Sequence, residues 1–223
     1  MMVRNRPYQR RRRAPVLLVV AALAVAAGVT WATVLINTGA ASGVTSCPRP
    51  TAGPPPGAVV TQAALAKVPP APPSTVKVRV LNAGGQRGQA NLVAAQFSDF
   101  GFAQAAQPTN DAFFPDGDMT CTGQIRFGQA GQGGASTVAL LVPCAELIRD
   151  ARRDDSVDVA VGTTFGDLNP GRAVRDALDQ LGASGSGSDG SANADPTAGN
   201  AQVQGTPVVD PATLAAARQA TCG

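Results

Sequence analysis

The chain has 223 residues, of which 44% are hydrophobic and 15% charged, and it contains no histidine. The lack of histidine excludes Ser-His-Asp and Cys-His nucleophile pairs and zinc sites with histidine ligands. Six of the eighteen Lys and Arg residues precede residue 14, so the chain from residue 14 onward carries twelve basic and fifteen acidic residues. This mildly acidic balance, together with the few aromatic residues, argues against nucleic acid as a partner.

The N-terminal region predicts a membrane anchor. Residues 1–13 are rich in arginine, and residues 14–36 contain no charge. A helix over the second segment would span roughly 34 Å, more than the ~30 Å hydrocarbon core of a bilayer. Because the arginines precede this helix, the positive-inside rule places the N-terminus in the cytoplasm and the C-terminal domain on the extracytoplasmic (periplasmic) side. The alternatives are a cleaved signal peptide and lipid attachment at Cys47.

Residues 37–75 predict an extracytoplasmic linker. Nine prolines lie between Pro48 and Pro73, and proline-rich chain favours extended, semi-rigid conformations. We therefore expect this segment to hold the following domain away from the membrane, with a short docked turn possible over residues 59–67.

The folded domain is predicted over residues 76–181. Val and Leu alternate with Lys and Arg at its start, as is typical of a half-buried strand. Apolar residues at helical spacing then predict a helix that lays one face on a sheet. In chain order the predicted elements are a strand over 76–81, a helix over 89–100, strands over 102–107 and 124–128, a helix over 133–142, a strand over 157–161 and a helix over 172–181.

The order β-α-β-β-α-β-α predicts an α/β (α+β) fold, either ferredoxin-like or a related mixed β-sheet with helices packed on one face. Residues 145–149 fit either a strand or a helical turn, and residues 108–121 fit a long polar loop. Residues 182–207 are too rich in Gly, Ser, Ala and Asn to build a core and predict a disordered linker. Residues 208–223 predict a short C-terminal helix, with Pro211 suited to its first turn.

Four cysteines in an exported chain predict two disulfides, because the extracytoplasmic compartment permits oxidation. Cys121 and Cys144 lie within the predicted domain, and Cys47 and Cys222 flank it. The most economical pairing joins the inner two and the outer two. A free or intermolecular Cys222 is the alternative.

One turn has the position of an anion-binding site. Gly84, Gly85, Arg87 and Gly88 follow a predicted strand and open a predicted helix, where backbone amides and the helix dipole can hold a phosphate or carboxylate of an envelope polymer. The spacing is neither G-x-G-x-x-G nor a P-loop, which favours a plain strand-to-helix turn.

Oxygen-bearing side chains surround Gly117, but they lack the order of an EF-hand loop, so we expect a polar turn rather than a calcium site. They are Asn110, Asp111, Asp116 and Asp118.

Residues 149–158 carry a run of mixed charge that we expect to pair locally or to solvate a surface, with a partner contact as the alternative. Glu146 is the only glutamate and has no evident second carboxylate, so no glycosidase pair is predicted. We therefore predict no catalytic, cofactor-binding or metal-binding residues.

Four segments carry a resemblance to a known family. They resemble the LytR C-terminal domain (LytR_C) over about residues 76–167. Three further features make the chain similar to actinobacterial envelope proteins that carry this domain. They are the Arg-rich anchor, the segment PPAPPSTVKVRVLN that leads into the domain, and Pro143-Cys144. The segments are VRVLNAGGQRGQA at 78–90, Gly101-Phe102, CTGQIRFG at 121–128 and SVDVAVGTTF at 156–165.

The resemblance implies a non-enzymatic role in cell envelope integrity, and the same module occurs appended to ligases that attach glycopolymers to the cell wall. The family supplies no catalytic residues to carry over. One hypothesis is a binding or scaffolding module for a wall polymer or an envelope protein. The other is an enzyme or accessory factor of glycopolymer attachment that acts on a lipid-linked or sugar substrate.

Overall fold

The computed structural model describes residues 19–20, 23–25, 27, 46–186 and 209–219 of the chain. The chain divides into two units, Met1–Ser42 and Gly43–Gly223. In the first unit the described residues are helical. No helix within the described part of the chain is long and apolar enough to cross a membrane. The Arg-rich segment and most of the predicted membrane span lie outside the described residues.

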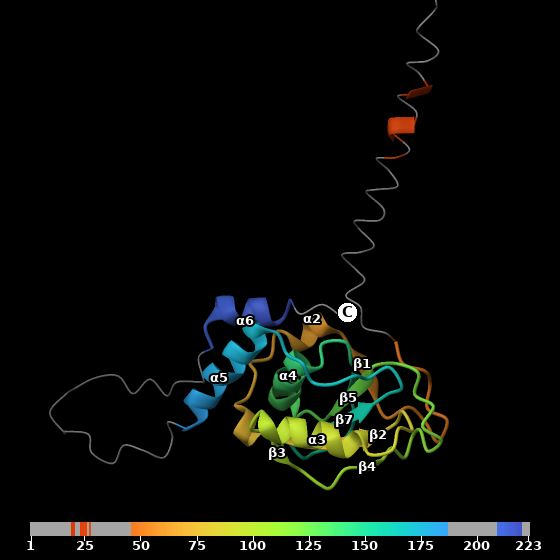
Figure 1. Cartoon of the computed structure of the whole chain (residues 1–223), viewed down its shortest axis with the longest axis vertical. Helices are drawn as coiled ribbons and strands as arrows, with labels where there is room; N and C mark the ends of the chain where they lie inside the picture. Colours follow the sequence, from red (N-terminus) through yellow and green to blue (C-terminus); the bar gives the residue numbers. More distant parts are fainter. Residues whose placement is uncertain (1–18, 21–22, 26, 28–45, 187–208, 220–223) are drawn as a thin grey trace, which may run out of the picture. The chain divides into compact units, whose positions relative to one another are not determined.

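The second unit is built on a seven-stranded mixed sheet with the order β1-β6-β5-β7-β2-β3, in which β4 also pairs with β2 (Figure 1). β2 runs parallel to β7, β5 runs parallel to β6, and β5 and β7 join these two pairs in antiparallel register. The strands are β1 (Ala58–Val60), β2 (Lys77–Asn82), β3 (Ala103–Gln104), β4 (Thr109–Asn110), β5 (Gly123–Phe127), β6 (Glu146–Arg149) and β7 (Val157–Val161).

Two long helices, α3 and α4, pack against strands of this sheet, and a third, α5, packs against α4 and a 3-10 turn. Successive side chains of a strand point to opposite faces, and the apolar set of each strand meets the apolar stripes of the helices in one core, where Val93, Val138 and Leu181 are fully buried. The helices are α2 (Gln62–Leu65), α3 (Gln89–Asp99), α4 (Gln132–Leu141), α5 (Arg172–Ser186) and α6 (Pro211–Ala217), with a 3-10 turn at Pro73–Thr75.

The opposite face of the sheet is divided into an apolar part and a polar part. At one end a second, smaller cluster of buried side chains covers the strands. It consists of Leu81, Ala83, Phe114, Met119, Cys121 and Ala160, with Cys47 and Phe113 packed against it. The rest of this face carries charged and amide side chains and holds the candidate site described below.

The mixed α+β architecture agrees with the sequence prediction, but the strand content differs. Residues 145–149, which the sequence left open, contain β6, which pairs in parallel with β5 after the α4 crossover. The predicted strand over 102–107 is reduced to β3, and β4 lies within the predicted loop over 108–121. Within the described residues the domain therefore has more strands than the four predicted for a ferredoxin-like sheet.

The described part of the predicted linker packs on the domain. We call residues 46–60 the N-terminal strap. The backbone N–H groups of Thr51 and Ala52 donate to the Phe113 carbonyl at 3.1 Å, and β1 pairs with β6. Further along, the backbone N–H of Ala71 donates to the Gly133 carbonyl at 3.1 Å. This segment is therefore part of the fold rather than a spacer.

The disulfide pairing expected from the sequence is wrong. Cys47 of the strap is bonded to Cys121, which lies just before β5. Cys144 is also disulfide-bonded, whereas Cys222 lies outside the described residues. The expectation paired Cys121 with Cys144 because it treated the chain around Cys47 as detached from the domain.

The C-terminal helix returns to the domain. α6 lies against α5 in Figure 1. The backbone N–H of Asp210 donates to Oε1 of Gln180 at 2.9 Å, and the Asp210 carboxylate caps α6 by accepting from the backbone N–H of Thr213 at 2.9 Å. Pro211 occupies the first turn, as predicted. Residues 182–186 extend α5, while the rest of the predicted Gly/Ser-rich linker up to residue 207 lies outside the described residues.

Candidate functional site

Polar side chains gather on the open face of the sheet because of the two-residue period of its strands. Where Val and Ile point to the helices, their neighbours point the other way: Arg79 from β2, Asp158 from β7, and Gln124 and Arg126 from β5. We call this set the charged face, together with three side chains supplied by loops. These are Asp111 after β4, and Asp150 and Arg152 between β6 and β7.

Asp158 lies at the centre of one ion-pair network. Arg79 donates to its carboxylate with two nitrogens, from Nε at 2.9 Å and from Nη2 at 2.5 Å. Arg152 donates from Nη2 to the same carboxylate at 2.7 Å and also donates to Asp150 from Nε and Nη2. The Asp158 side chain is only 4% exposed. The carboxylate therefore holds two guanidinium groups in fixed positions.

Arg126 forms a second, more deeply buried network. Its Nη1 pairs with Oδ2 of Asp111 at 2.7 Å, and both side chains are almost fully buried. Its Nε and Nη2 donate to Oε1 of Gln124, whose Nε2 in turn donates to Oε2 of Glu146 at 2.8 Å. The ring of Phe113 lies 4.9 Å from the Arg126 guanidinium carbon. This guanidinium therefore has a partner on every side.

The electrostatics of the charged face keep its groups ionised and paired. Burial raises the pKa of Asp158, but the hydrogen bonds from Arg152 and Arg79 outweigh it, and the pKa lies below its usual 3.8. Burial likewise lowers the pKa of Arg152, but its bonds to Asp158 and Asp150 raise it overall. The hydrogen bond to Asp158 also raises the pKa of Arg79. Burial lowers the pKa of Arg126, against the opposing attraction of Asp111.

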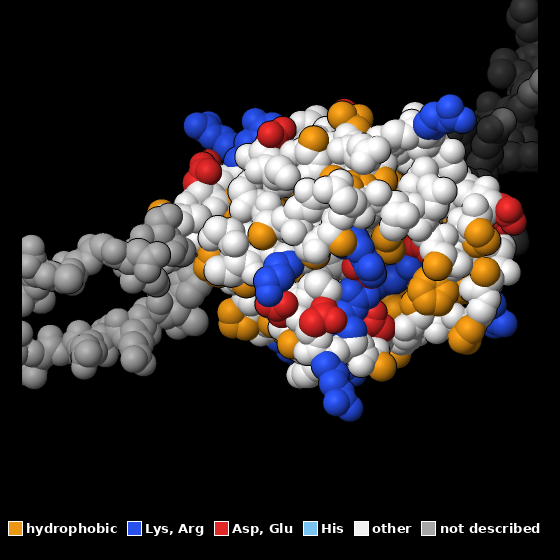
Figure 2. All heavy atoms as spheres, turned by 90° about the horizontal axis from the view of Figure 1, so that it is seen from below, with side chains coloured by type: hydrophobic (Ala, Val, Ile, Leu, Met, Phe, Trp, Pro, Cys, Tyr) orange, Lys and Arg blue, Asp and Glu red, His pale blue; other side chains and the backbone are white. Residues whose placement is uncertain are grey.

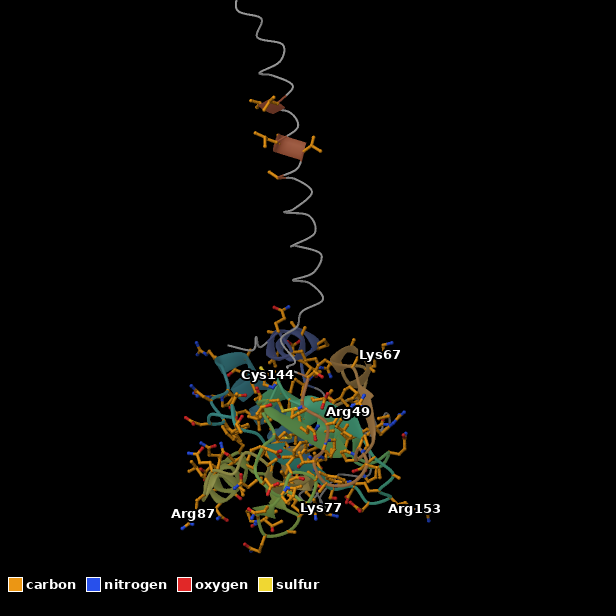
Figure 3. The ribbon with its side chains drawn as sticks, turned by 90° about the vertical axis from the view of Figure 1, so that its right-hand side faces the viewer. Arg49, Lys67, Lys77, Arg87, Cys144 and Arg153 are labelled. Atoms are coloured by element: carbon orange, nitrogen blue, oxygen red, sulfur yellow. A yellow bond between two sulfur atoms is a disulfide. The ribbon has the colours of Figure 1, made fainter. Side chains whose placement is uncertain are left out.

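A groove of about 750 Å³ lies over the charged face. Lys77 and Asp155 form an exposed ion pair at 3.1 Å among its lining residues, and Figure 3 shows Lys77 and Arg153 at the end of the domain away from Cys144. Apolar side chains interrupt the charges, including Leu81 and Phe113. Figure 2 shows such a surface, where Lys and Arg side chains lie beside acidic and hydrophobic ones.

The predicted anion-binding turn is explained by backbone packing. A Cβ atom on Gly84 would lie 2.6 Å from the carbonyl carbon of Gly162, and Gly85 and Gly88 have φ angles of 73° and 80°. Arg87 is exposed and points outward, away from the labelled Lys77 (Figure 3). Gly84 thus permits a close approach of two backbone segments, Gly85 and Gly88 adopt a left-handed conformation, and anion binding at this turn stays a prediction.

The structure divides the acidic residues around Gly117. Asp111 turns to Arg126, and Asp118 accepts a hydrogen bond from Oγ1 of Thr51 at 3.3 Å. Within the described residues, no group of three or more acidic or cysteine side chains could hold a metal ion. From the mixed-charge run, Asp150, Arg152 and Asp158 enter the site by pairing locally, as expected.

Sequence reasoning missed Arg79, Gln124 and Arg126. The available signal was period two: Arg79 and Arg126 each stand between two core positions of a strand, and Gln124 lies two residues before Arg126, so these side chains must point to the opposite face. A charged residue enclosed by Ile125 and Phe127 therefore indicates a functional or buried-pair position on that face.

Comparisons with known proteins agree with this architecture. Residues 75–165 match the LytR_C family, described as LytR cell envelope-related transcriptional attenuator. The structure is similar, with a TM-score of 0.60 and 37% sequence identity, to the crystal structure of the soluble domain of a conserved hypothetical secreted protein from Mycobacterium marinum, covering 75% of this chain and 99% of that one.

A curated relative extends the similarity beyond the matched domain. The chain is 41% identical over 166 residues to the cell envelope integrity protein Cei of Mycobacterium tuberculosis, covering 72% of this chain and 76% of that protein. The aligned length therefore includes residues outside the LytR_C segment. By this identity and coverage, the chain belongs to the family of the cell envelope integrity protein Cei and carries a LytR_C domain.

Proposed function

We propose that this protein is a membrane-anchored, non-enzymatic protein that maintains the cell envelope by binding or scaffolding an envelope component through the groove over the charged face. The component is a wall polymer or another envelope protein. The name of the Mycobacterium tuberculosis relative supports the envelope role. In this proposal residues 14–36 form the single-pass anchor, with the N-terminus in the cytoplasm and the domain outside.

Two observations support an extracytoplasmic domain. The Cys47–Cys121 disulfide suits an oxidising compartment, and the Mycobacterium marinum relative is described as the soluble domain of a secreted protein. A reporter fused to the C-terminus, active only outside the cytoplasm, tests this topology. Activity of a cytoplasmic reporter at the same position would refute it.

The observation that carries the binding role is the groove with paired charges beneath it. Removing ions from water costs more than a typical surface pair returns, so a sheet face on which two networks hold five charged side chains is a poor stabilising device. It does hold donors and acceptors in fixed positions, which is what a ligand site requires. The five are Arg79, Arg126, Arg152, Asp111 and Asp158.

The network around Asp158 favours binding over acid catalysis. A carboxyl that donates a proton near neutral pH needs a raised pKa. Asp158 instead has a lowered pKa, because Arg152 and Arg79 stabilise its charged form against the cost of burial. This supports a non-catalytic role for the groove.

A groove-filling variant tests the proposal in cells that lack their own copy. Ala106 is exposed and lines the groove without belonging to the ion-pair networks, so Ala106→Trp should block a ligand and leave the fold intact. Ala95→Trp, on the exposed surface of α3, is the matched control.

We expect the wild type and Ala95→Trp to restore resistance to detergent and exclusion of a membrane-impermeant dye, and Ala106→Trp to fail at equal protein level. Full restoration by Ala106→Trp would show that the groove is not where this protein acts.

A further inference from the structure

We infer that the groove binds an uncharged carbohydrate segment with adjacent hydroxyl groups, in preference to a phosphate-containing polymer. This inference rests on the proposed function and names the ligand class for the same groove. It is argued from the charge balance of the lining, the hydrogen-bonding capacity left on its ion pairs, and the apolar side chains between them.

The lining is close to neutral. It contains four basic side chains and five acidic ones. All four basic side chains have carboxylate partners, at distances from 2.5 to 3.1 Å. A phosphate that approached any of these basic groups would bring its negative charge next to a carboxylate, and the two like charges would repel each other. The basic residues are Lys77, Arg79, Arg126 and Arg152, and the acidic residues are Asp111, Asp150, Asp154, Asp155 and Asp158.

A hydroxyl group can use this surface without breaking a pair, because it both donates and accepts a hydrogen bond. A guanidinium has five N–H donors. Arg79 uses Nε and Nη2 on Asp158, and its side chain is 40% exposed. Its other N–H groups can donate to a ligand oxygen, while a neighbouring hydroxyl donates to a carboxylate such as that of Asp155, which is half exposed. Adjacent hydroxyls on a sugar ring supply this combination.

The apolar lining suits the C–H faces of sugar rings. Leu81, Ala105, Ala106 and Phe113 lie between the charged groups of the groove. Phe113 is fixed in place: its carbonyl accepts from the strap, and its backbone N–H donates to Oδ1 of Asp111 at 2.7 Å. The volume of about 750 Å³ falls within the range of ligand pockets, ~300–1,000 Å³. A short oligosaccharide therefore fits the groove in size and in chemistry.

The test is isothermal titration calorimetry on the purified full-length chain in detergent. The probes are uncharged hexasaccharides of glucose, galactose, mannose and arabinose in α and β linkages, with polyglycerol phosphate as the anionic comparison. We expect at least one hexasaccharide to bind, with an affinity that changes less than about twofold between low and high salt, because no ion pair forms.

We expect Ala106→Trp to weaken that binding by at least about tenfold, or ~1.4 kcal/mol, and Ala95→Trp to leave it unchanged. Arg79→Gln should weaken it as well, and because Arg79 is partly exposed the variant should keep its circular dichroism spectrum.

Three outcomes would overturn the inference: no binding of any hexasaccharide, binding that Ala106→Trp leaves intact, or salt-sensitive binding of polyglycerol phosphate in the groove. These differ from failure of the proposed function. If Ala106→Trp fails in cells although no hexasaccharide binds, the groove acts on a different ligand, such as a protein. If a hexasaccharide binds in the groove but Ala106→Trp restores the envelope, the proposed function is wrong.

Discussion

The buried pair of Arg126 and Asp111 is the most demanding test of the charged face. Arg126→Met keeps the length of the apolar stem and removes the guanidinium. Asp111 then loses its partner at 2.7 Å and keeps the backbone N–H of Phe113, while its side chain has no exposure to water. Removing one partner of a buried pair costs about 3–5 kcal/mol. We expect the free energy of unfolding to fall by that amount.

The assay is urea unfolding of residues 46–223 followed by circular dichroism, because the only Trp and Tyr, Trp31 and Tyr8, lie outside this segment. Lys77→Met is the matched control. Its pair with Asp155 lies at 3.1 Å but is about half exposed on both sides, and exposed pairs contribute about 1 kcal/mol or less.

The double variant Arg126→Met/Asp111→Asn separates a buried charge from a general loss of packing. It leaves no uncompensated ion, so we expect it to recover most of the stability lost by the single variant. The reasoning is refuted if Arg126→Met costs no more than Lys77→Met, or if the double variant is less stable than Arg126→Met.

Three further predictions address other parts of the fold. Because the pKa of Asp158 is lower in the folded state than in the unfolded state, its charged form stabilises the domain above pH 3.8, and this contribution is lost as the pH falls through the folded-state pKa. In urea titrations the stability difference between wild type and Asp158→Asn should therefore narrow below pH 3.8, and a constant difference would contradict this. Cys47→Ser/Cys121→Ser opens a bridge between residues 74 apart and should lower the unfolding free energy by about 4 kcal/mol, measured in urea; an unchanged midpoint would show that the bridge constrains nothing. Gly84→Ala forces a Cβ to 2.6 Å from the carbonyl carbon of Gly162, so we expect the free energy of unfolding to fall by about 1–3 kcal/mol and the melting temperature to fall with it. In Gly166→Ala the added Cβ meets nothing within 4 Å, so this control should be nearly neutral.

The sequence predicted the elements in which pattern and length agree. β2 and β7 carry Val at every second position, and α3 has a helical stripe, so their type and approximate bounds followed directly. β6 was left open because Leu147 and Ile148 are both apolar and the run is short. One of them faces the helices and the other faces the open side, which removes the alternation that identifies a strand.

The remaining features depend on contacts far apart in the chain. β1 lies in a proline-rich segment that gives no strand signal, and its pairing with β6 joins residues 58–60 to 147–149. The partner of Cys121 followed from that docking rather than from spacing. In the site, Asp150 and Arg152 pair locally and could be foreseen, whereas the pairing of Arg126 with Asp111 is set by where the loop after β4 crosses the sheet.

The bond between Cys47 and Cys121 also determines how the domain bears tension. It closes residues 48–120 into a covalent loop. A pull on the chain N-terminal to Cys47 passes across the sulfur atoms to Cys121 and directly into β5, which lies inside the sheet between β6 and β7. β1, β2 and α3 lie within that loop and are outside the covalent path of the load, so the pull reaches an interior strand before the edge strand β1.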